Sequence, residues 1–154
     1  IVVDGTGAAS KPLLKKKEEL EALGYDTLMI MIWVSPYTSL ERNAQRDRAL
    51  PPAIVLRTWR DVNKNVETYK GAFGNNFILL DNDPEARLDF DPEYVKATFF
   101  QTVKGSGKQY TPEEKLKKKA EADAMNQEIS NLLKTSPDFM SIEDAKSKIN
   151  NFLQ

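Results

Sequence analysis

The most restrictive feature of the sequence is one uninterrupted apolar run from Leu28 to Val34, with Thr27 before it and Ser35 after it. The run is far shorter than the ~20 residues that a membrane-spanning helix needs. A segment that is apolar at every position, rather than at every second one, is typical of a central parallel strand covered by helices on both faces. The run therefore predicts a parallel sheet.

The elements predicted around this run alternate between strands and helices. The first is a buried strand (Val2, Val3) that ends at Asp4. A helix capped by Ser10 follows; it carries Leu13, Leu20 and Leu23 on an apolar stripe and ends at Gly24. The remaining elements are the strand 27–34, a polar helix capped by Ser35 that runs to about Arg48, one helix over 55–73, and a strand over 77–80. The 55–73 helix carries apolar residues spaced 4, 3, 4, 3 and 4 apart, which are Val55, Trp59, Val62, Val66, Tyr69 and Phe73. This order predicts an α/β domain over residues 1–83.

Residues 84–154 carry no strand signal and predict an α-helical C-terminal extension. We expect a helix from Asp91 to Val103, a loop over 104–108, a long charged helix from the Thr111 capping box to Leu133, and a last helix from Ser141 to Phe152. The extension is a candidate surface for a protein partner.

Composition excludes several kinds of chemistry. The 154 residues include no His and no Cys, so a Ser-His-Asp triad, a thiol nucleophile and a Cys- or His-based metal site are ruled out. A net charge of −1 gives no general attraction to nucleic acid or to a membrane. With no signal peptide and no membrane span in sight, we expect a cytoplasmic protein.

The first candidate site is Asp4-Gly5-Thr6-Gly7, at the predicted end of a strand. Ligands of parallel sheets bind at the carboxyl ends of strands, where Ser35 and Asp81 are also expected. A carboxylate there can orient Mg²⁺-bound water, and glycines let a phosphate approach the backbone. The alternative is an aspartate that only stabilises its own turn.

The second candidate site is the arginine-rich segment 42–48. Arg42 and Arg46 are four residues apart and are expected on one helix face, with Arg48 near the helix end. Three guanidinium groups can bind phosphate oxygens in pairs and stabilise charge on a transferring phosphoryl group. The alternative is a solvated face on which Glu41 and Asp47 pair with the arginines.

Other patterns are less specific. Gly105-Ser106-Gly107-Lys108 is not a phosphate-binding loop, because Thr102 and Gln109 stand where the motif needs Gly and Ser or Thr. The lysine runs 15–17 and 117–119 lie beside glutamates and predict solvated surface, so nucleic-acid contact is open but not favoured. Trp33 and Trp59 are expected in the core, whereas Tyr37 could stack on a ligand or lie on the surface.

Together, these motifs resemble the C-terminal half of a P-loop kinase. The similarity is to zeta-toxin-like and polynucleotide-kinase-like small kinases, in which a strand ending in Asp-x-Thr precedes a second strand and a lid of the form Arg-Asn-x-x-Arg-x-Arg, followed shortly by Pro. Here these are Asp4 to Thr6, the apolar run, and Arg42 to Arg48 before Pro51. The resemblance covers residues 1–83, and the lid is its most specific piece.

The resemblance implies a parallel-sheet P-loop NTPase-like fold with ATP and Mg²⁺ as cofactors. The phosphoryl acceptor would be a hydroxyl of a sugar, a nucleotide or another small molecule. Arg42, Arg46 and Arg48 would be lid arginines facing the ATP phosphates, and Asp4 would lie near Mg²⁺ with Thr6 beside it.

The family's Walker A loop and its catalytic base precede the Asp-x-Thr strand, and neither motif is in this sequence. We therefore expect an N-terminally truncated chain that is inactive alone, has an uncovered sheet edge or face, and is marginally stable or self-associates. One rival interpretation is a non-catalytic binding or assembly module that keeps the kinase-like sheet and uses the helix from Thr111 as a partner surface. A nucleotide-hydrolysing switch is less favoured, because no guanine-recognition pattern is present.

Overall fold

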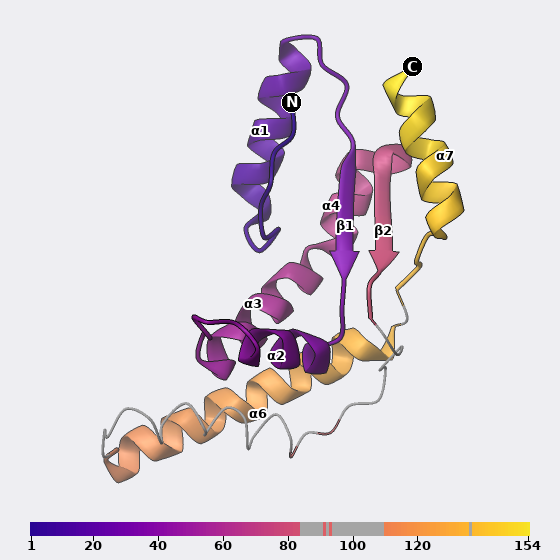
Figure 1. Ribbon diagram of the computed structural model, residues 1–154. Coiled ribbons are helices and arrows are strands. Elements are labelled where there is room, and N and C mark those ends of the chain that lie inside the picture. The colour runs from indigo at the N-terminus through magenta and orange to yellow at the C-terminus, as the bar shows by residue number, and fades with distance from the viewer. Residues whose placement is uncertain (84–90, 92, 94–109, 136) are drawn as a thin grey trace. The chain divides into compact units, whose positions relative to one another are not determined.

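The computed structural model describes residues 1–83, 91, 93, 110–135 and 137–154. The helices and strands are α1 (Ser10–Ala22), β1 (Met29–Trp33), α2 (Pro36–Ala44), α3 (Pro52–Lys64), α4 (Val66–Phe73), the 3-10 helix η1 (Gly74–Asn76), β2 (Phe77–Asp81), α6 (Pro112–Lys134) and α7 (Ile142–Leu153) (Figure 1). The two strands are parallel, so the α/β class is confirmed.

The chain divides into two compact units, which are described separately. The first consists of Ile1–Val34, Asp61–Pro84 and Pro137–Gln154, and the second of Ser35–Arg60 and Glu85–Ser136. The sheet therefore belongs to the first unit together with α1, α4 and α7, whereas α2 and α6 belong to the second. Helix α3 runs through the boundary between the two units.

The sheet buries one face of β1. Met29 lies opposite Phe77 in the register, and Trp33 lies opposite Asp81. Met31 and Trp33, which share a face, are buried as expected of core residues. The Trp33 indole Nε1 donates a hydrogen bond to Asn63 Oδ1 at 2.8 Å, which satisfies the polar atom of this buried ring.

The prediction that β1 is covered on both faces is wrong. Ile30 and Ile32 share the other face and are 44% and 53% exposed. No other described strand pairs with β1 on the side away from β2, so β1 is an edge strand rather than a central one. A run of apolar residues indicates that a strand can be buried on both faces, but burial also requires other elements that pack against each face.

The predicted strand at Val2 and Val3 is also wrong. Residues 1–6 form no strand, and Val2 is 95% exposed. Three β-branched residues favour an extended backbone, but a strand also needs a neighbour to pair with. As a consequence, Asp4 does not lie at the end of a strand.

Helix α1 is close to its prediction but differs at both ends. Ala9 rather than Ser10 occupies the N-cap position, so no side chain caps the helix, and Leu23 at the other end is exposed. Gly24 follows with a φ of 87°, which is the left-handed conformation that commonly ends helices.

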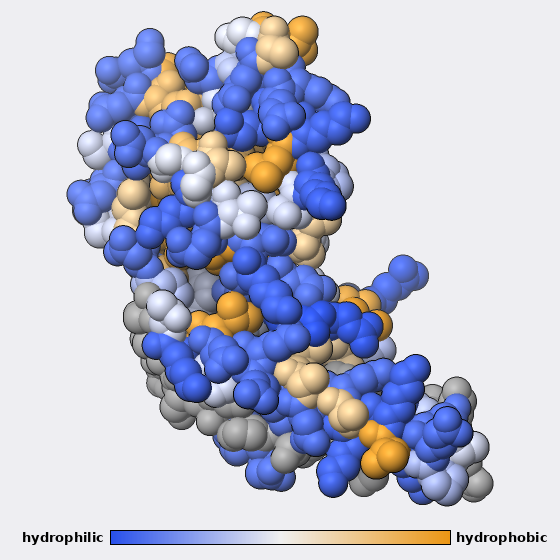
Figure 2. All heavy atoms as spheres, turned by 180° about the vertical axis from the view of Figure 1, so that it is seen from behind, coloured by the Kyte–Doolittle hydropathy of each residue, from blue (hydrophilic) through white to orange (hydrophobic). Residues whose placement is uncertain are grey.

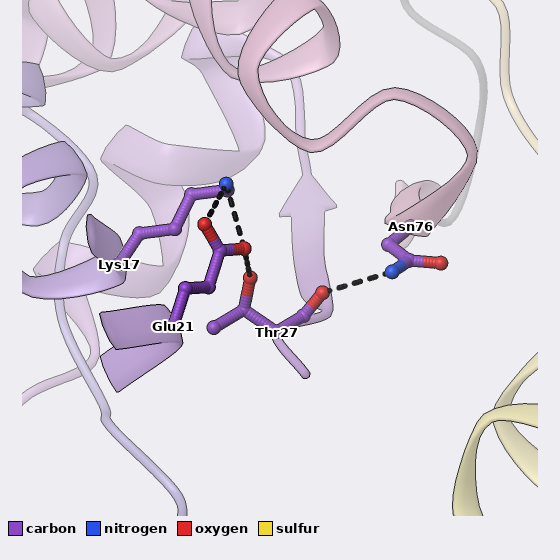
Figure 3. Close-up of polar contacts among 4 residues, drawn as sticks. All are labelled: Lys17, Glu21, Thr27 and Asn76. Carbon is purple, nitrogen blue, oxygen red and sulfur yellow. Dashed lines mark hydrogen bonds and ion pairs between the residues drawn. The ribbon is translucent and has the colours of Figure 1, made fainter. Parts of the chain in front are cut away.

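A small polar cluster ties α1 to the start of β1 (Figure 3). Lys17 Nζ lies 2.7 Å from the Glu21 carboxylate, and the Thr27 hydroxyl donates to Glu21 Oε1 at 2.6 Å. Asn76 Nδ2, in η1, donates to the Thr27 carbonyl at 3.1 Å. These contacts lower the pKa of Glu21, chiefly through the hydrogen bond from Lys17 and then through that from Thr27.

Two predicted helices are shorter than expected. The Ser35 cap is confirmed, since Ser35 Oγ accepts from Thr38 N at 3.2 Å, but α2 ends at Ala44 instead of near Arg48. The single helix predicted over 55–73 is two helices, α3 and α4, separated at Asn65. An apolar stripe can continue in register across such a break, so periodicity alone does not reveal it.

The C-terminal helices follow their sequence signals. Thr111 and Glu114 form the predicted capping box at the start of α6, and Ser141 caps α7. The buried face of α6 consists of Ala122, Met125, Asn126, Ile129 and Leu133. Apart from Asp91 and Glu93, the helix predicted from Asp91 to Val103 and the loop over 104–108 lie outside the described residues.

The surface seen from behind is mostly hydrophilic, with hydrophobic residues in small separate patches (Figure 2). Among the described helices, none is long and apolar enough to span a bilayer.

Candidate functional site

The first candidate site, Asp4 to Gly7, is a turn held by two side chains from beyond α3. The Tyr69 hydroxyl, in α4, donates to the Gly7 carbonyl at 2.7 Å. Asn65 Nδ2 donates to the carbonyls of Gly7 at 3.2 Å and Ala8 at 2.9 Å. Gly7 has a φ of 72°, so the chain reverses there in a conformation that glycine adopts without strain. The end of this turn is therefore fixed in the first unit.

Asp4 itself is exposed and takes no part in holding the turn. The contact within the turn comes from Thr6, whose Oγ1 accepts from Ala8 N at 3.4 Å. No hydrogen bond or ion pair of Asp4 occurs within the described part of the chain, so its carboxylate is open to an external ligand. The interpretation of Asp4 as a residue that only stabilises its own turn is not supported by these contacts.

Tyr69 is the buried residue among those that hold the turn at Gly7. Its side chain is fully buried, and this burial raises the pKa of the phenol above its ordinary value of 10.0. The hydroxyl is therefore protonated at neutral pH and available as the donor to Gly7. A tyrosine in an apolar stripe can bury its ring while its hydroxyl reaches a backbone carbonyl.

The second candidate site, residues 42–48, is helical only over 42–44 and continues as a turn. Arg42 lies in the last turn of α2, but Arg46 and Arg48 lie beyond the helix end, so the expectation of Arg42 and Arg46 on one helix face is wrong. Arg46 N donates to the Asn43 carbonyl at 3.2 Å, which turns the chain away from the helix axis.

Asn43 closes this turn from the inside. Its Nδ2 donates to the Leu50 carbonyl at 2.8 Å, and its Oδ1 accepts from Leu50 N at 2.9 Å. Because Asn43 is buried and makes both bonds to one residue, it fixes the two ends of the loop that carries Arg46 and Arg48. We refer to residues 43–50 as the arginine loop.

All three arginines are exposed. Within the described residues, no carboxylate lies at ion-pair distance from Arg46 or Arg48, although Glu41 and Asp47 are close in sequence. The alternative of internal pairing is therefore not realised for these two. Two guanidinium groups on a short closed loop, without internal counter-ions, are suited to bind an oxyanion.

The structure assigns the two candidate sites to different units. Asp4 and Thr6 belong to the first unit, and Arg42, Arg46 and Arg48 belong to the second. Of the other strand-end residues, Ser35 is buried as a helix cap, and Asp81 Oδ1 accepts from Asp83 N at 2.9 Å. Tyr37 contributes a hydroxyl that accepts from Asp91 N.

Metal binding has one candidate ligand in this arrangement. No group of three or more acidic side chains that could hold an ion occurs in the part of the chain that the structure describes. Asp4 could contribute one oxygen to an ion that is held mainly by phosphates and water, as Mg²⁺ often is.

The residues that hold both turns are not among the candidate site residues predicted from the sequence. Asn43, Asn65 and Tyr69 all fall inside predicted helices. The two asparagines carry a signal, because asparagine is unfavourable inside a helix and favoured in turns, whereas Tyr69 carries none.

Comparison with protein-family models, with curated proteins and with solved structures finds no match to this chain. The local geometry and the motifs are therefore the basis for the function proposed below.

Proposed function

We propose that this chain is the C-terminal part of a P-loop kinase that transfers a phosphoryl group from ATP to a hydroxyl of a sugar, a nucleotide or another small molecule. The observation that carries the proposal is the arginine loop. It follows a capped helix that is separated by two residues from the parallel strand β1, and it presents Arg46 and Arg48 without internal counter-ions within the described residues.

The arginines would act on the phosphates of ATP. During transfer, the acceptor oxygen forms a bond to the γ-phosphorus, the bond from that phosphorus to the β–γ bridging oxygen breaks, and ADP leaves. Negative charge shifts toward the bridging oxygen, and positively charged donors fixed in advance near it lower the barrier. The closed loop supports this role because Asn43 restricts where Arg46 and Arg48 can go.

The remaining machinery is proposed to lie outside these 154 residues. The phosphate-binding loop and the base that takes the proton of the acceptor hydroxyl have no counterpart in this sequence. Asp4, with a carboxylate open to an external ligand, fits as one oxygen ligand of a Mg²⁺ ion held by the nucleotide, and Mg²⁺ would supply charge neutralisation of the phosphates. The proposal thus assigns binding and charge stabilisation, but no proton transfer, to this chain.

The test uses a longer protein that contains these residues, and ATP binding to this protein is measured first. Arg46→Ala should lower kcat at least 10-fold in an assay of ATP consumption with a panel of hydroxyl acceptors. Arg57→Ala is the matched control, because Arg57 is also an exposed arginine of the same unit but lies in the middle of α3. Equal turnover of the Arg46→Ala variant and the control would refute the assignment, and a longer protein that does not bind ATP would favour the binding or assembly module.

A further inference from the structure

The sheet of the first unit is closed on one side and open on the other. On the β2 side, the Leu79 carbonyl accepts a hydrogen bond from Met140 N at 2.8 Å. On the β1 side, no backbone hydrogen bond joins residues 29–32 to any segment other than β2 within the described chain. The outer edge of β1 therefore presents a row of unpaired backbone groups, which can template another strand.

This edge has none of the features with which proteins usually prevent pairing. Edge strands are commonly protected by charged residues, by proline or by a bulge. β1 has the sequence Met-Ile-Met-Ile-Trp and runs in unbroken register with β2. Ile30 and Ile32 are about half exposed beside the edge, so pairing there would also cover apolar surface.

The same chain carries an exposed segment of matching chemistry. Ile1, Val2 and Val3 are 86%, 95% and 62% exposed, and all three are β-branched. We call residues 1–6 the arm; it ends at Gly7, whose carbonyl is fixed by Tyr69 and Asn65. Six extended residues span about 20 Å, so the arm can reach well away from its anchor.

The arm and the edge together account for much of the exposed apolar surface. Of the twelve large hydrophobic residues exposed in the described chain, five belong to these two features. Within the described chain, the arm makes no backbone pairing with its own β1. The arm has a sequence that favours a strand but has no strand beside it, and the outer edge of β1 has no strand paired with it in the part of the chain that the structure describes.

We propose that the 154-residue chain forms a reciprocal dimer, in which the arm of each copy adds a strand to the outer edge of β1 in the other copy. The arrangement is self-complementary, because each copy gives one arm and receives one, as a twofold axis requires. Backbone hydrogen bonds provide the pairing, and the arm side chains cover Ile30 and Ile32. The inference concerns the 154-residue chain and involves neither the arginine loop nor a nucleotide, so a failed dimerisation test would leave the proposed kinase function standing.

The interface is small, so the dimer should be weak. Interfaces below the usual 1,200 Å² are typical of transient complexes, and we expect a Kd of roughly 10–100 μM. Sedimentation velocity of the unmodified chain from about 1 to 500 μM should show the mass rising from one copy to two. A single-copy mass over this whole range would overturn the proposal.

Two variants separate the arm from the edge. Ile32→Lys places a charge beside the edge, Val2→Asp places one in the arm, and both positions are more than half exposed, so the fold should tolerate them. Each variant alone should shift the Kd at least 10-fold toward the monomer. Ile54→Lys, at an exposed apolar position of α3 in the second unit, is the matched control and should dimerise normally.

Mixing the variants tests the reciprocal geometry. Val2→Asp retains an intact edge and Ile32→Lys retains an intact arm, so the mixture should form a heterodimer with one of the two contacts, tighter than either variant alone. Direct pairing of β1 with β1 of the other copy would instead leave Val2→Asp dimeric, and this result would overturn the arm assignment. Far-UV circular dichroism checks that each variant is folded.

Discussion

The Asn43 clamp gives the sharpest prediction about the arginine loop. Asn43 makes two hydrogen bonds to the backbone of Leu50, at 2.8 and 2.9 Å, and each such bond contributes about 0.5–1.5 kcal/mol net. Leu50 is itself exposed, so its freed N–H and C=O can bond to water and carry little extra penalty. Asn43→Ala should therefore destabilise the second unit by about 1–3 kcal/mol, which corresponds to roughly 3–9 °C in Tm.

The assay needs a probe of the second unit alone. Trp59 is buried there, whereas Trp33 belongs to the first unit, so a Trp33→Phe background leaves one fluorescent reporter, which lies in the second unit. Gln45→Ala is the control, since Gln45 is exposed in the same turn. An unchanged melting temperature of Asn43→Ala in this background would refute the reasoning that the clamp fixes the loop.

Three further predictions concern the first unit. The pKa of Glu21 is lowered in the folded state, so its contact with Lys17 stabilises the fold above about pH 4.5, and this stabilisation is lost as the pH falls through the folded-state pKa. Glu21→Gln should therefore make the free energy of unfolding less dependent on pH in the acid range. Tyr69→Phe should lower the free energy of unfolding by about 1 kcal/mol in urea denaturation at neutral pH, because the hydrogen bond to Gly7 is lost. Since the pKa of Tyr69 is raised in the folded state, the phenol ionises more readily in the unfolded chain and stability falls as the pH rises above 10; Tyr69→Phe should remove this part of the loss. In thermal melts, Gly7→Ala should destabilise the first unit by about 1–2 kcal/mol, because Gly7 has a positive φ, even though the nearest atom to the added Cβ would be an ordinary 3.8 Å away. Its control is Gly71→Ala in α4, where nothing lies within 4 Å of the added Cβ, and this change should stabilise by about 0.5–1 kcal/mol.

The elements that the sequence predicted well are those whose signals are local. The capping box at Thr111, the cap at Ser35 and strand β2 all depend on residues within one turn or one short run. The buried positions of Trp33 and Trp59 were also predicted, because large apolar side chains in apolar patterns have few alternatives to the core.

Two of the errors have a different origin, which is dependence on distant partners. The arm was predicted as a strand from its β-branched residues, but it has no strand beside it. The helix after Ser35 was predicted to continue to Arg48, but the amide of Asn43 bonds to Leu50 and turns the chain. In both cases the local preference was real, and a contact or its absence elsewhere decided the outcome.

The same distinction applies to the candidate site. Residue types and spacing identified Asp4 and the arginines as groups that could meet a phosphate, and the structure leaves Asp4, Arg46 and Arg48 without partners within the described chain. Spacing could not predict that Arg46 and Arg48 lie on a closed turn. The closed turn affects phosphate binding because it restricts the backbone that carries the two arginines. Less conformational entropy is then lost when they bind an anion than would be lost by arginines on an open, flexible segment. Conversely, if Asn43→Ala left both stability and ATP turnover unchanged, the two arginines would be ordinary surface charges, and the argument for a lid would rest on the motif alone.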